Sequence, residues 1–314
     1  MNALESPRIS VFNGDRVSFG RHETFPLRYG WLTKGFQEIS KSARALSAED
    51  ATVQLGVGRN MVHSIRYWLR ATRIAEVDKD GLAPTALGKK IFGKDGFDPY
   101  LEDEATIWLI HWLLASNPEQ ATAWYWFFNR FHKSEFTSQE AVTAITQFFR
   151  TYVTSKQSIT KVKQDSSIVL RMYVQTKAAP RTPLEDVLDS PLSTLRLISF
   201  TPGTRRYRSA PATRSALPID IFAFAVSDLF DFRNTPAIPI EELMGGRSNF
   251  PAPGSIFRLS ESGLLGVLEQ LVHEYPKEFD LRETSGLHQL YKIGQKKSIE
   301  FLDLHYGHTI SKAA

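Results

Sequence analysis

Apolar residues recur at helical spacing between Arg59 and Arg73 and predict a helix with one side in the protein core. This stripe consists of Met61, Ile65, Trp68, Leu69 and Thr72. A second set recurs at similar spacing on a neighbouring face: His63, Arg66, Arg70 and Arg73, with Asn60 at its edge. A surface helix needs only the apolar stripe, whereas guanidinium, imidazole and amide groups in one row suit phosphates and base edges. The pattern therefore predicts a helix that binds nucleic acid.

The flanking sequence predicts a winged helix around this segment. Residues 48–54 form a short predicted helix with Ser47 as N-cap, and a glycine-containing turn at 56–58 follows. Residues 75–82 predict a small hairpin, and Thr85 caps a further helix over 86–92. Arg59, Ser64, Lys89 and Lys90 complete the set expected to bind DNA. A winged helix that serves only as scaffold or dimer contact is the alternative.

The next two hydrophobic segments favour a buried core. Residues 97–117 begin with acidic residues and continue as a helix that is apolar nearly all round. The aromatic run ATAWYWFFNRF (121–131) could stack bases, but three consecutive aromatic residues on a helix are more typical of a core. Residues 137–152 predict an amphipathic helix with Thr137 as N-cap and Glu140 in a capping-box position.

The second half of the chain is predicted to be a separate helical domain. The polar, basic stretch 154–164 has no apolar period, so we expect domains at 1–155 and 156–314. Segment 201–218 is the most basic and predicts a mobile loop that either clamps a phosphate backbone or is simply solvated. Its arginines are Arg205, Arg206, Arg208 and Arg214.

A second winged-helix-like arrangement is predicted within 240–281. A short helix at 241–244 is followed by a loop with Arg247 and by a helix at 261–274, which Ser260 can cap. The latter helix exposes no arginine or lysine, so we expect a core or dimer element there and DNA contact at Arg247 instead. The fold class is therefore mainly α: a helical two-domain protein with a winged-helix unit in its N-terminal half.

Composition excludes several kinds of chemistry. The 314 residues carry a formal net charge of +4, which is compatible with a polyanionic partner. The chain has no cysteine, so disulfides, thiolate zinc sites, iron–sulfur ligation and cysteine nucleophiles are excluded. Neither a signal peptide nor an apolar run long enough to cross a bilayer is evident, so we expect a cytoplasmic protein without membrane contact.

Two clusters are candidates for catalysis. Arg21, His22, Glu23 and Arg28 lie among aromatic residues in 17–34 and could supply a general base and phosphate-binding cations. The alternative is an aromatic plug whose charges pair with each other. Asp98, Glu102 and Asp103 could bind a divalent metal such as Mg²⁺ or Mn²⁺, although acidic residues also complement the first turn of a helix. No phosphate loop, dinucleotide fingerprint, nucleophile elbow, zinc-protease helix or convincing nuclease core is present.

Several strings resemble a bacterial family of unknown function whose genes lie beside sulfur-modification genes. They are FGRHETFPLRYGWLTKG, LGVGRNMVHSIRYW, DPYLEDEATIWLIHWLLAS, ATAWYWFFN and PAPGSIFRLSESGL, in order over nearly the whole chain. The resemblance implies a role in DNA phosphorothioation, an anti-phage modification, as the B component of an Ssp-type single-strand system. It implies double-stranded DNA, a sulfur-transfer enzyme, a cysteine desulfurase and an ATPase as partners. It supplies no catalytic motif, so no active-site residue is carried over.

Three functions agree with these observations. In a DNA nickase, Asn60, His63, Arg66 and Arg70 would bind DNA. His22 or Glu23 would then act as general base, while Arg21 and Arg28 stabilise charge on the phosphate oxygens. A non-catalytic adaptor would bind DNA and deliver the sulfur-transfer enzymes. A transcriptional regulator fits less well because no effector domain is evident. A homodimer is compatible with each function.

Overall fold

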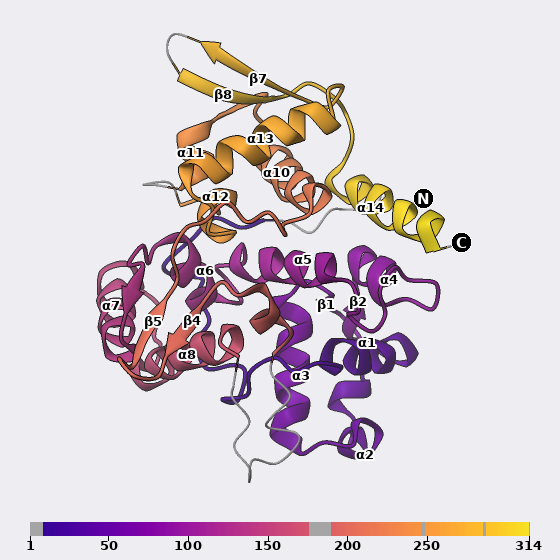
Figure 1. Ribbon diagram of the computed structural model, residues 1–314. Helices are drawn as coiled ribbons and strands as arrows, with labels where there is room; N and C mark the ends of the chain where they lie inside the picture. The colour runs from indigo at the N-terminus through magenta and orange to yellow at the C-terminus, as the bar shows by residue number, and fades with distance from the viewer. Residues whose placement is uncertain (1–8, 176–189, 246–248, 285–286, 314) are drawn as a thin grey trace. The chain divides into compact units, whose positions relative to one another are not determined.

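The computed structural model describes residues 9–175, 190–245, 249–284 and 287–313. These residues are mainly helical with small antiparallel sheets, as the sequence predicted (Figure 1). They divide into two compact units, one made of the described residues within 12–210 and the other of residues 9–11 together with the described residues within 211–313. The expected domain boundary at residue 155 stays a prediction.

The unit Phe12–Ala210 contains most of the helices. In chain order its elements are α1 (Trp31–Lys41), η1 (Ala45–Ser47), α2 (Ala51–Leu55), α3 (Arg59–Ala71), β1 (Ala75–Asp78), β2 (Gly81–Pro84), α4 (Ala86–Phe92), α5 (Glu104–Ala115), α6 (Thr122–Asn129), β3 (Glu135–Phe136), α7 (Ser138–Tyr152), α8 (Ile159–Tyr173), η2 (Pro191–Leu195), β4 (Ser199–Thr201) and β5 (Arg206–Arg208).

The segment from α2 to α4 has the predicted order of helix, turn, helix, hairpin and helix. Gly56 ends α2 with a φ of 65°, a left-handed conformation that glycine adopts without strain. The short helix begins at Ala51 rather than at 48, because Ser47 belongs to the 3₁₀ turn η1. Thr85 caps α4 as expected, since its hydroxyl accepts from the Gly88 amide at 3.0 Å. Figure 1 shows α2 beside the first turn of α3 and the β1–β2 hairpin near its last turn.

The two most hydrophobic helices are α5, which is buried from Ala105 to its last residue, and α6, which is buried throughout. Trp108 and Trp112 of α5, together with Trp124 and Tyr125 of α6, are each no more than 1% exposed. His111 is fully buried on α5, and its Nδ1 lies 2.7 Å from the Tyr173 hydroxyl of α8. The core interpretation of the aromatic run is thus confirmed.

The basic segment that begins at residue 201 is not the mobile loop that its composition predicted. Residues 206–208 form β5, the central strand of an antiparallel sheet with the order β3-β5-β4. Tyr207 packs between Phe136 and Phe200, with ring centroids 5.8 Å and 4.8 Å away. These aromatic contacts order the strand although four arginines lie within 205–214. The polar stretch before residue 165 is likewise partly ordered, since α8 begins at Ile159.

In the second unit, helix α10 packs against α12, α13 and α14. Its elements are α10 (Ile219–Arg233), β6 (Ala237–Pro239), α11 (Ile240–Met244), α12 (Pro253–Ile256), α13 (Glu261–Glu274), β7 (Phe279–Thr284), β8 (Leu287–Lys292) and α14 (Ser298–Ala313). The strands form an antiparallel sheet with the order β6-β8-β7. Ser260 caps α13 as expected, because its hydroxyl accepts from the Gly263 amide at 3.1 Å. Arg247 lies outside the described residues.

The start of α7 carries the capping box that the sequence predicted. The Thr137 hydroxyl accepts from the Glu140 amide at 3.2 Å, and the Glu140 carboxylate accepts from the Thr137 amide at 2.7 Å. The ammonium of Lys133 also donates to this carboxylate. Lys133 and these amide contacts lower the pKa of Glu140 to about 2.

We expect Glu140 to contribute to the acid sensitivity of folding. Its pKa is lower in the folded chain than the ordinary value of 4.5, so its stabilising contribution is complete above pH 4.5 and is lost as the pH falls toward 2. Glu140→Gln should lower stability at neutral pH and flatten the loss of stability between those two values. Urea unfolding followed by circular dichroism over this pH range measures the effect. Glu76→Gln, which alters an exposed glutamate outside any cap, should leave the pH profile unchanged.

Candidate functional site

A strained turn presents two of the predicted catalytic residues. The His22 carbonyl accepts from the Phe25 amide at 2.9 Å, which closes a four-residue turn. The central residues Glu23 and Thr24 have φ values of 47° and 65°, a left-handed conformation that costs about 1–2 kcal/mol for a residue other than glycine. Contacts of the turn with its surroundings must compensate for this strain. The side chains of Arg21 and Glu23 are exposed here.

The imidazole of His22 lies beneath the turn and is 1% exposed. Its Nδ1 accepts from the Thr24 amide at 3.2 Å, and its Nε2 lies 2.9 Å from Oδ1 of Asp165. A backbone amide can only donate, so Nδ1 carries no proton and Nε2–H donates to the carboxylate. Both ring nitrogens are thus used within the protein, and neither is available to a substrate in this arrangement.

Asp165 of α8 anchors the turn from below, and sequence reasoning missed it. Its carboxylate also accepts from the Gly20 amide, at 3.0 Å for Oδ1 and 3.1 Å for Oδ2, and the residue is 1% exposed. The signal was present: Asp165 lies at helical spacing between the buried residues Val162 and Val169, where an apolar residue would be expected. A carboxylate on the buried side of a helix requires partners, here an imidazole and an amide.

Aromatic side chains fix the His22 ring against α3. The rings of His22 and Trp68 are stacked, with centroids 5.9 Å apart and an interplanar angle of 11°. Tyr67 and Trp124 each contact the imidazole edge-on at 5.8 Å. Trp68 also donates to the Phe25 carbonyl at 3.3 Å. The turn and the predicted DNA-binding helix are therefore held together, although about forty residues separate them in the sequence.

Three arginines lie close enough for their charges to interact where this turn adjoins α3. Burial lowers the pKa of the half-buried Arg70, and the charges of Arg66 and Arg21 lower it further. The Arg66 guanidinium donates to the Ser47 hydroxyl at 2.9 Å. Within the described parts of the chain, no carboxylate forms an ion pair with Arg21, Arg66 or Arg70. We call these three residues the arginine cluster; it is an uncompensated positive patch suited to phosphate.

Of the other residues of α3 and α4 that were predicted to bind DNA, some are exposed and others are buried or hydrogen-bonded within the protein. Arg59, Asn60 and His63 are exposed on the first turns of α3, and Lys89 is exposed on α4. Ser64 is fully buried, so its hydroxyl cannot reach a ligand. Arg73 follows the end of α3 and donates to the side chain and carbonyl of Ser116 at 3.2 Å and 2.7 Å. Contrary to the prediction from helical spacing, Arg73 therefore does not lie on the same helix face as Arg66 and Arg70.

Other predicted cations have partners within the fold. Lys90 places its ammonium 5.6 Å from the centroid of the Phe97 ring, and Arg28 lies 5.5 Å from the centroid of the Trp31 ring. Arg206 pairs with Glu135 at 3.4 Å and lies 3.9 Å from Glu140.

Arg205 and Arg208 flank that paired residue and are exposed. Of the predicted basic segment, these two arginines are therefore the better candidates for a phosphate contact.

The acidic set at the start of α5 has a structural role. Asp98 is 4% exposed and accepts from the amides of Glu102 and Asp103 at 2.8 Å and 3.1 Å. Asp103 in turn caps α5 by accepting from the Ala105 amide at 2.8 Å. Across the described residues, no group of three histidine, aspartate or glutamate side chains is arranged to hold a metal ion.

A partly buried hydrogen-bonded group lies in the unit that contains α10. Asp220 accepts from the Tyr275 hydroxyl, and its other carboxylate oxygen lies 2.9 Å from Nδ1 of His305. Burial and the Asp220 carboxylate hold the pKa of Tyr275 far above its ordinary value. The contact joins α10, the end of α13 and α14, and sequence reasoning did not connect these residues.

Comparison with known proteins gives one family and two solved structures. The family described as a protein of unknown function (DUF4007) matches residues 19–306. Curated protein sequences give no match. A structure described as "SspB crystal structure" is 29% identical, with a TM-score of 0.79, and the match covers 94% of this chain and 89% of that one.

The second structure is described as "Magnesium ion-bound SspB crystal structure". It is 31% identical, also with a TM-score of 0.79, and the match covers 92% of this chain and 88% of that one. The expected resemblance to the B component of an Ssp-type system is confirmed. With its family match over residues 19–306, the chain belongs to the DUF4007 family.

Proposed function

We propose that this chain is the DNA-nicking component of an Ssp-type DNA phosphorothioation system. The arginine cluster carries the proposal, because it combines phosphate-binding groups with an exposed carboxylate on the neighbouring turn. Similarity to SspB supports the biological context. DNA, a sulfur-transfer enzyme, a cysteine desulfurase and an ATPase are the partners that follow from this role.

The α2–α3 segment would bind DNA as a winged helix. Helix, turn, helix and hairpin follow one another from Ala51 to Pro84, and α3 would occupy the major groove. Arg59, Asn60 and His63 at its start would reach base edges, while Arg66 and Arg70 would contact phosphates. None of the described helices is both long and apolar enough to cross a membrane.

The turn would supply the chemistry. Glu23 would take a proton from a water molecule as the water oxygen bonds to phosphorus. The bond from phosphorus to the leaving sugar oxygen would break, and that oxygen would take a proton from solvent water. Arg21 and Arg70 would stabilise the charge on the non-bridging oxygens. His22 and Asp165 would act as positioning residues, since they hold the strained turn from below without reaching the substrate.

A divalent cation would supply further stabilisation of the phosphate charge when bound. One of the similar structures is described as magnesium-bound. Among the described residues of this chain, no three side chains are arranged to bind a metal ion. The carboxylates of Asp98 and Asp103 accept hydrogen bonds from backbone amides. No step is therefore assigned to a metal ion here.

The second candidate function is a DNA-binding adaptor without nuclease activity. The buried, fully hydrogen-bonded His22 favours it, because the predicted general base does not reach the surface. An adaptor would use the same arginine cluster for binding and would leave DNA intact.

Removal of the clustered arginines should weaken DNA binding. Arg66→Ala and Arg70→Ala should each lower the affinity for duplex DNA about tenfold at moderate salt, because each removes one phosphate contact. Each should also lower the slope of the logarithm of affinity against the logarithm of salt concentration by about one. Fluorescence anisotropy over a salt series measures both quantities. Arg150→Ala removes an exposed arginine from α7 and is the matched control. Unchanged affinity in both α3 variants would exclude α3 as the DNA-binding helix.

Loss of the Glu23 carboxylate should separate binding from nicking. With supercoiled plasmid, and with EDTA, magnesium or manganese in parallel, Glu23→Gln should slow formation of open circles at least about a hundredfold while binding is retained. Glu102→Gln, which alters an exposed glutamate of the acidic set, should nick normally. Loss of nicking in Glu102→Gln alone would move the active site to that set. Binding without nicking by the unaltered protein would establish the adaptor.

The buried pair should determine the stability of the turn. His22→Ala leaves the Asp165 carboxylate without its imidazole partner and should lower the free energy of unfolding by about 3 kcal/mol. His22→Gln retains an N–H donor and should lose less, because the imidazole donates as a neutral group. Urea denaturation compares the variants, with Glu23→Gln as the exposed control on the same turn. Equal losses for alanine and glutamine would show that ring packing, not the hydrogen bond, holds the turn.

A further inference from the structure

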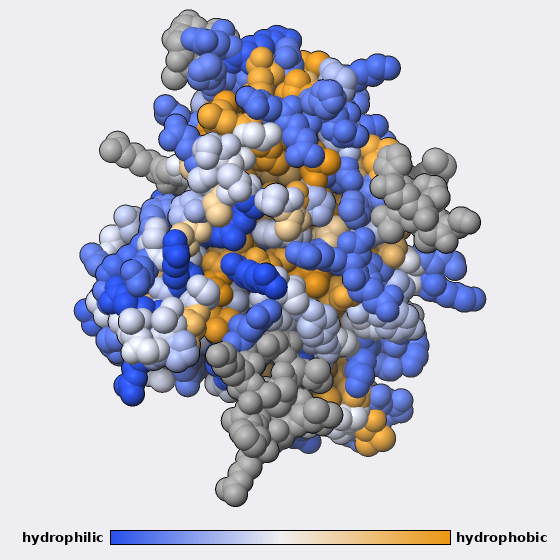
Figure 2. Space-filling view, viewed as in Figure 1, coloured by the Kyte–Doolittle hydropathy of each residue, from blue (hydrophilic) through white to orange (hydrophobic). Residues whose placement is uncertain are grey.

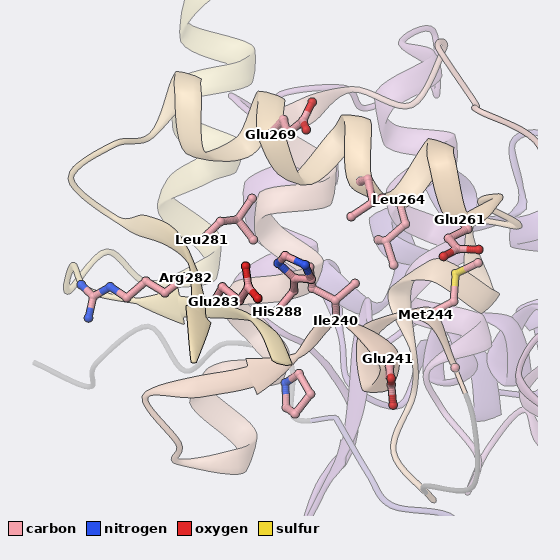
Figure 3. Close-up of a pocket in the computed structure, with 13 residues that line it drawn as sticks. Ile240, Glu241, Met244, Glu261, Leu264, Glu269, Leu281, Arg282, Glu283 and His288 are labelled. Atoms are coloured by element: carbon pink, nitrogen blue, oxygen red, sulfur yellow. The ribbon is translucent and has the colours of Figure 1, made fainter. Parts of the chain in front are cut away.

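A groove of about 910 Å³ lies within the unit that contains α10–α14 and is not used by the proposed nicking reaction. Its walls come from α11, α13 and the β7–β8 hairpin (Figure 3). All of the described residues that line the groove belong to this one unit.

The floor of the groove is apolar. Ile240, Leu264 and Leu281 extend toward one another from three different elements (Figure 3). Leu265 lies on the same side of α13 and is 41% exposed. Figure 2 shows hydrophobic surface surrounded by hydrophilic residues in the region where Figure 1 places α13. Exposed leucine next to other apolar side chains favours burial against a partner.

The rim of the groove is acidic. Glu241, Glu261, Glu269 and Glu283 line it, and none of the four forms an ion pair in the described parts of the chain. The cationic lining residue, Arg282, donates to Asp280 at 2.7 Å and lies 4.6 Å from the centroid of the Tyr291 ring. Figure 3 shows its guanidinium extending away from the apolar floor. The described residues that line the groove therefore carry a net negative charge.

This charge excludes DNA from the groove although the surrounding elements have the order of a winged helix. Helix α10, strand β6, helices α11, α12 and α13, and the hairpin β7–β8 follow one another, and α13 precedes its hairpin as α3 does in the other unit. The exposed residues of α3 are cationic or neutral, whereas α13 exposes Glu261 and Glu269. Four carboxylates would repel a phosphate backbone.

We propose that the groove binds a basic amphipathic segment of a partner protein. An apolar face of such a segment would cover Leu264, Leu265 and Leu281, and lysine or arginine side chains at its edges would pair with the rim glutamates. The four glutamates lie on three elements around the floor, so they suit charges spaced along a peptide rather than one small cation. The inference does not depend on nicking, since it involves none of the residues of the arginine cluster.

A synthetic amphipathic peptide, LKKLLKLLKKLLKL, labelled with a fluorophore, tests this in anisotropy titrations of the full-length protein. The acidic counterpart LEELLELLEELLEL is the control probe. We expect the basic peptide alone to bind, and Leu265→Asp and the double variant Glu261→Lys/Glu269→Lys each to weaken it about tenfold or more. All three altered positions are exposed, so the fold should persist.

Glu274→Lys is the matched control, because it reverses an exposed charge on α13 outside the groove. An equal loss in this control would overturn the proposal in favour of diffuse surface charge. Retained binding in Leu265→Asp would overturn it as well. A dimer in size-exclusion chromatography that Leu265→Asp dissociates would assign the groove to a second copy of the chain instead. Plasmid nicking should be unaffected in every groove variant, so failure of either proposal is visible separately.

Discussion

The hydrogen bonds of the Asp165 carboxylate hold the candidate site together. A buried carboxylate is costly unless donors surround it, and here the donors are the His22 imidazole and the Gly20 amide. These bonds join α8 to the turn, and the stacked rings of His22 and Trp68 join the turn to α3. Through this chain of contacts, Arg21 reaches the neighbourhood of Arg70, and an exposed carboxylate at Glu23 lies on the same turn.

The two units have similar orders of helices and strands, but the exposed side chains of the corresponding helices carry opposite charges. Helix α3 and helix α13 each follow a shorter helix and precede an antiparallel hairpin. The first exposes Arg59, His63 and part of Arg66, while the second exposes Glu261, Leu265 and Glu269. Fold alone does not determine function, so the roles that we propose, phosphate binding for α3 and protein binding for the groove beside α13, depend on the surface chemistry of the two helices.

Local signals in the sequence predicted much of the fold but little of the site. The amphipathic pattern of α3 and the caps at Thr85, Thr137 and Ser260 act within a few residues, so spacing reveals them. The His22–Asp165 contact spans 143 residues and has no local signature. Spacing also misplaced Ser64 and Arg73, because the helix buries the first and ends before the second. Composition predicted a loop where contacts of Tyr207 stabilise a strand.

The hydrogen bonds of the buried Asp165 limit local opening of the left-handed turn. Loop residues at a protein surface ordinarily open with little free energy, because few core contacts are lost. Opening this turn would expose the Asp165 carboxylate and separate the stacked rings of His22 and Trp68. The amides of Gly20 and Thr24 are therefore coupled to the cooperative unfolding of the helices, and the groups on the turn keep a fixed orientation before any ligand binds.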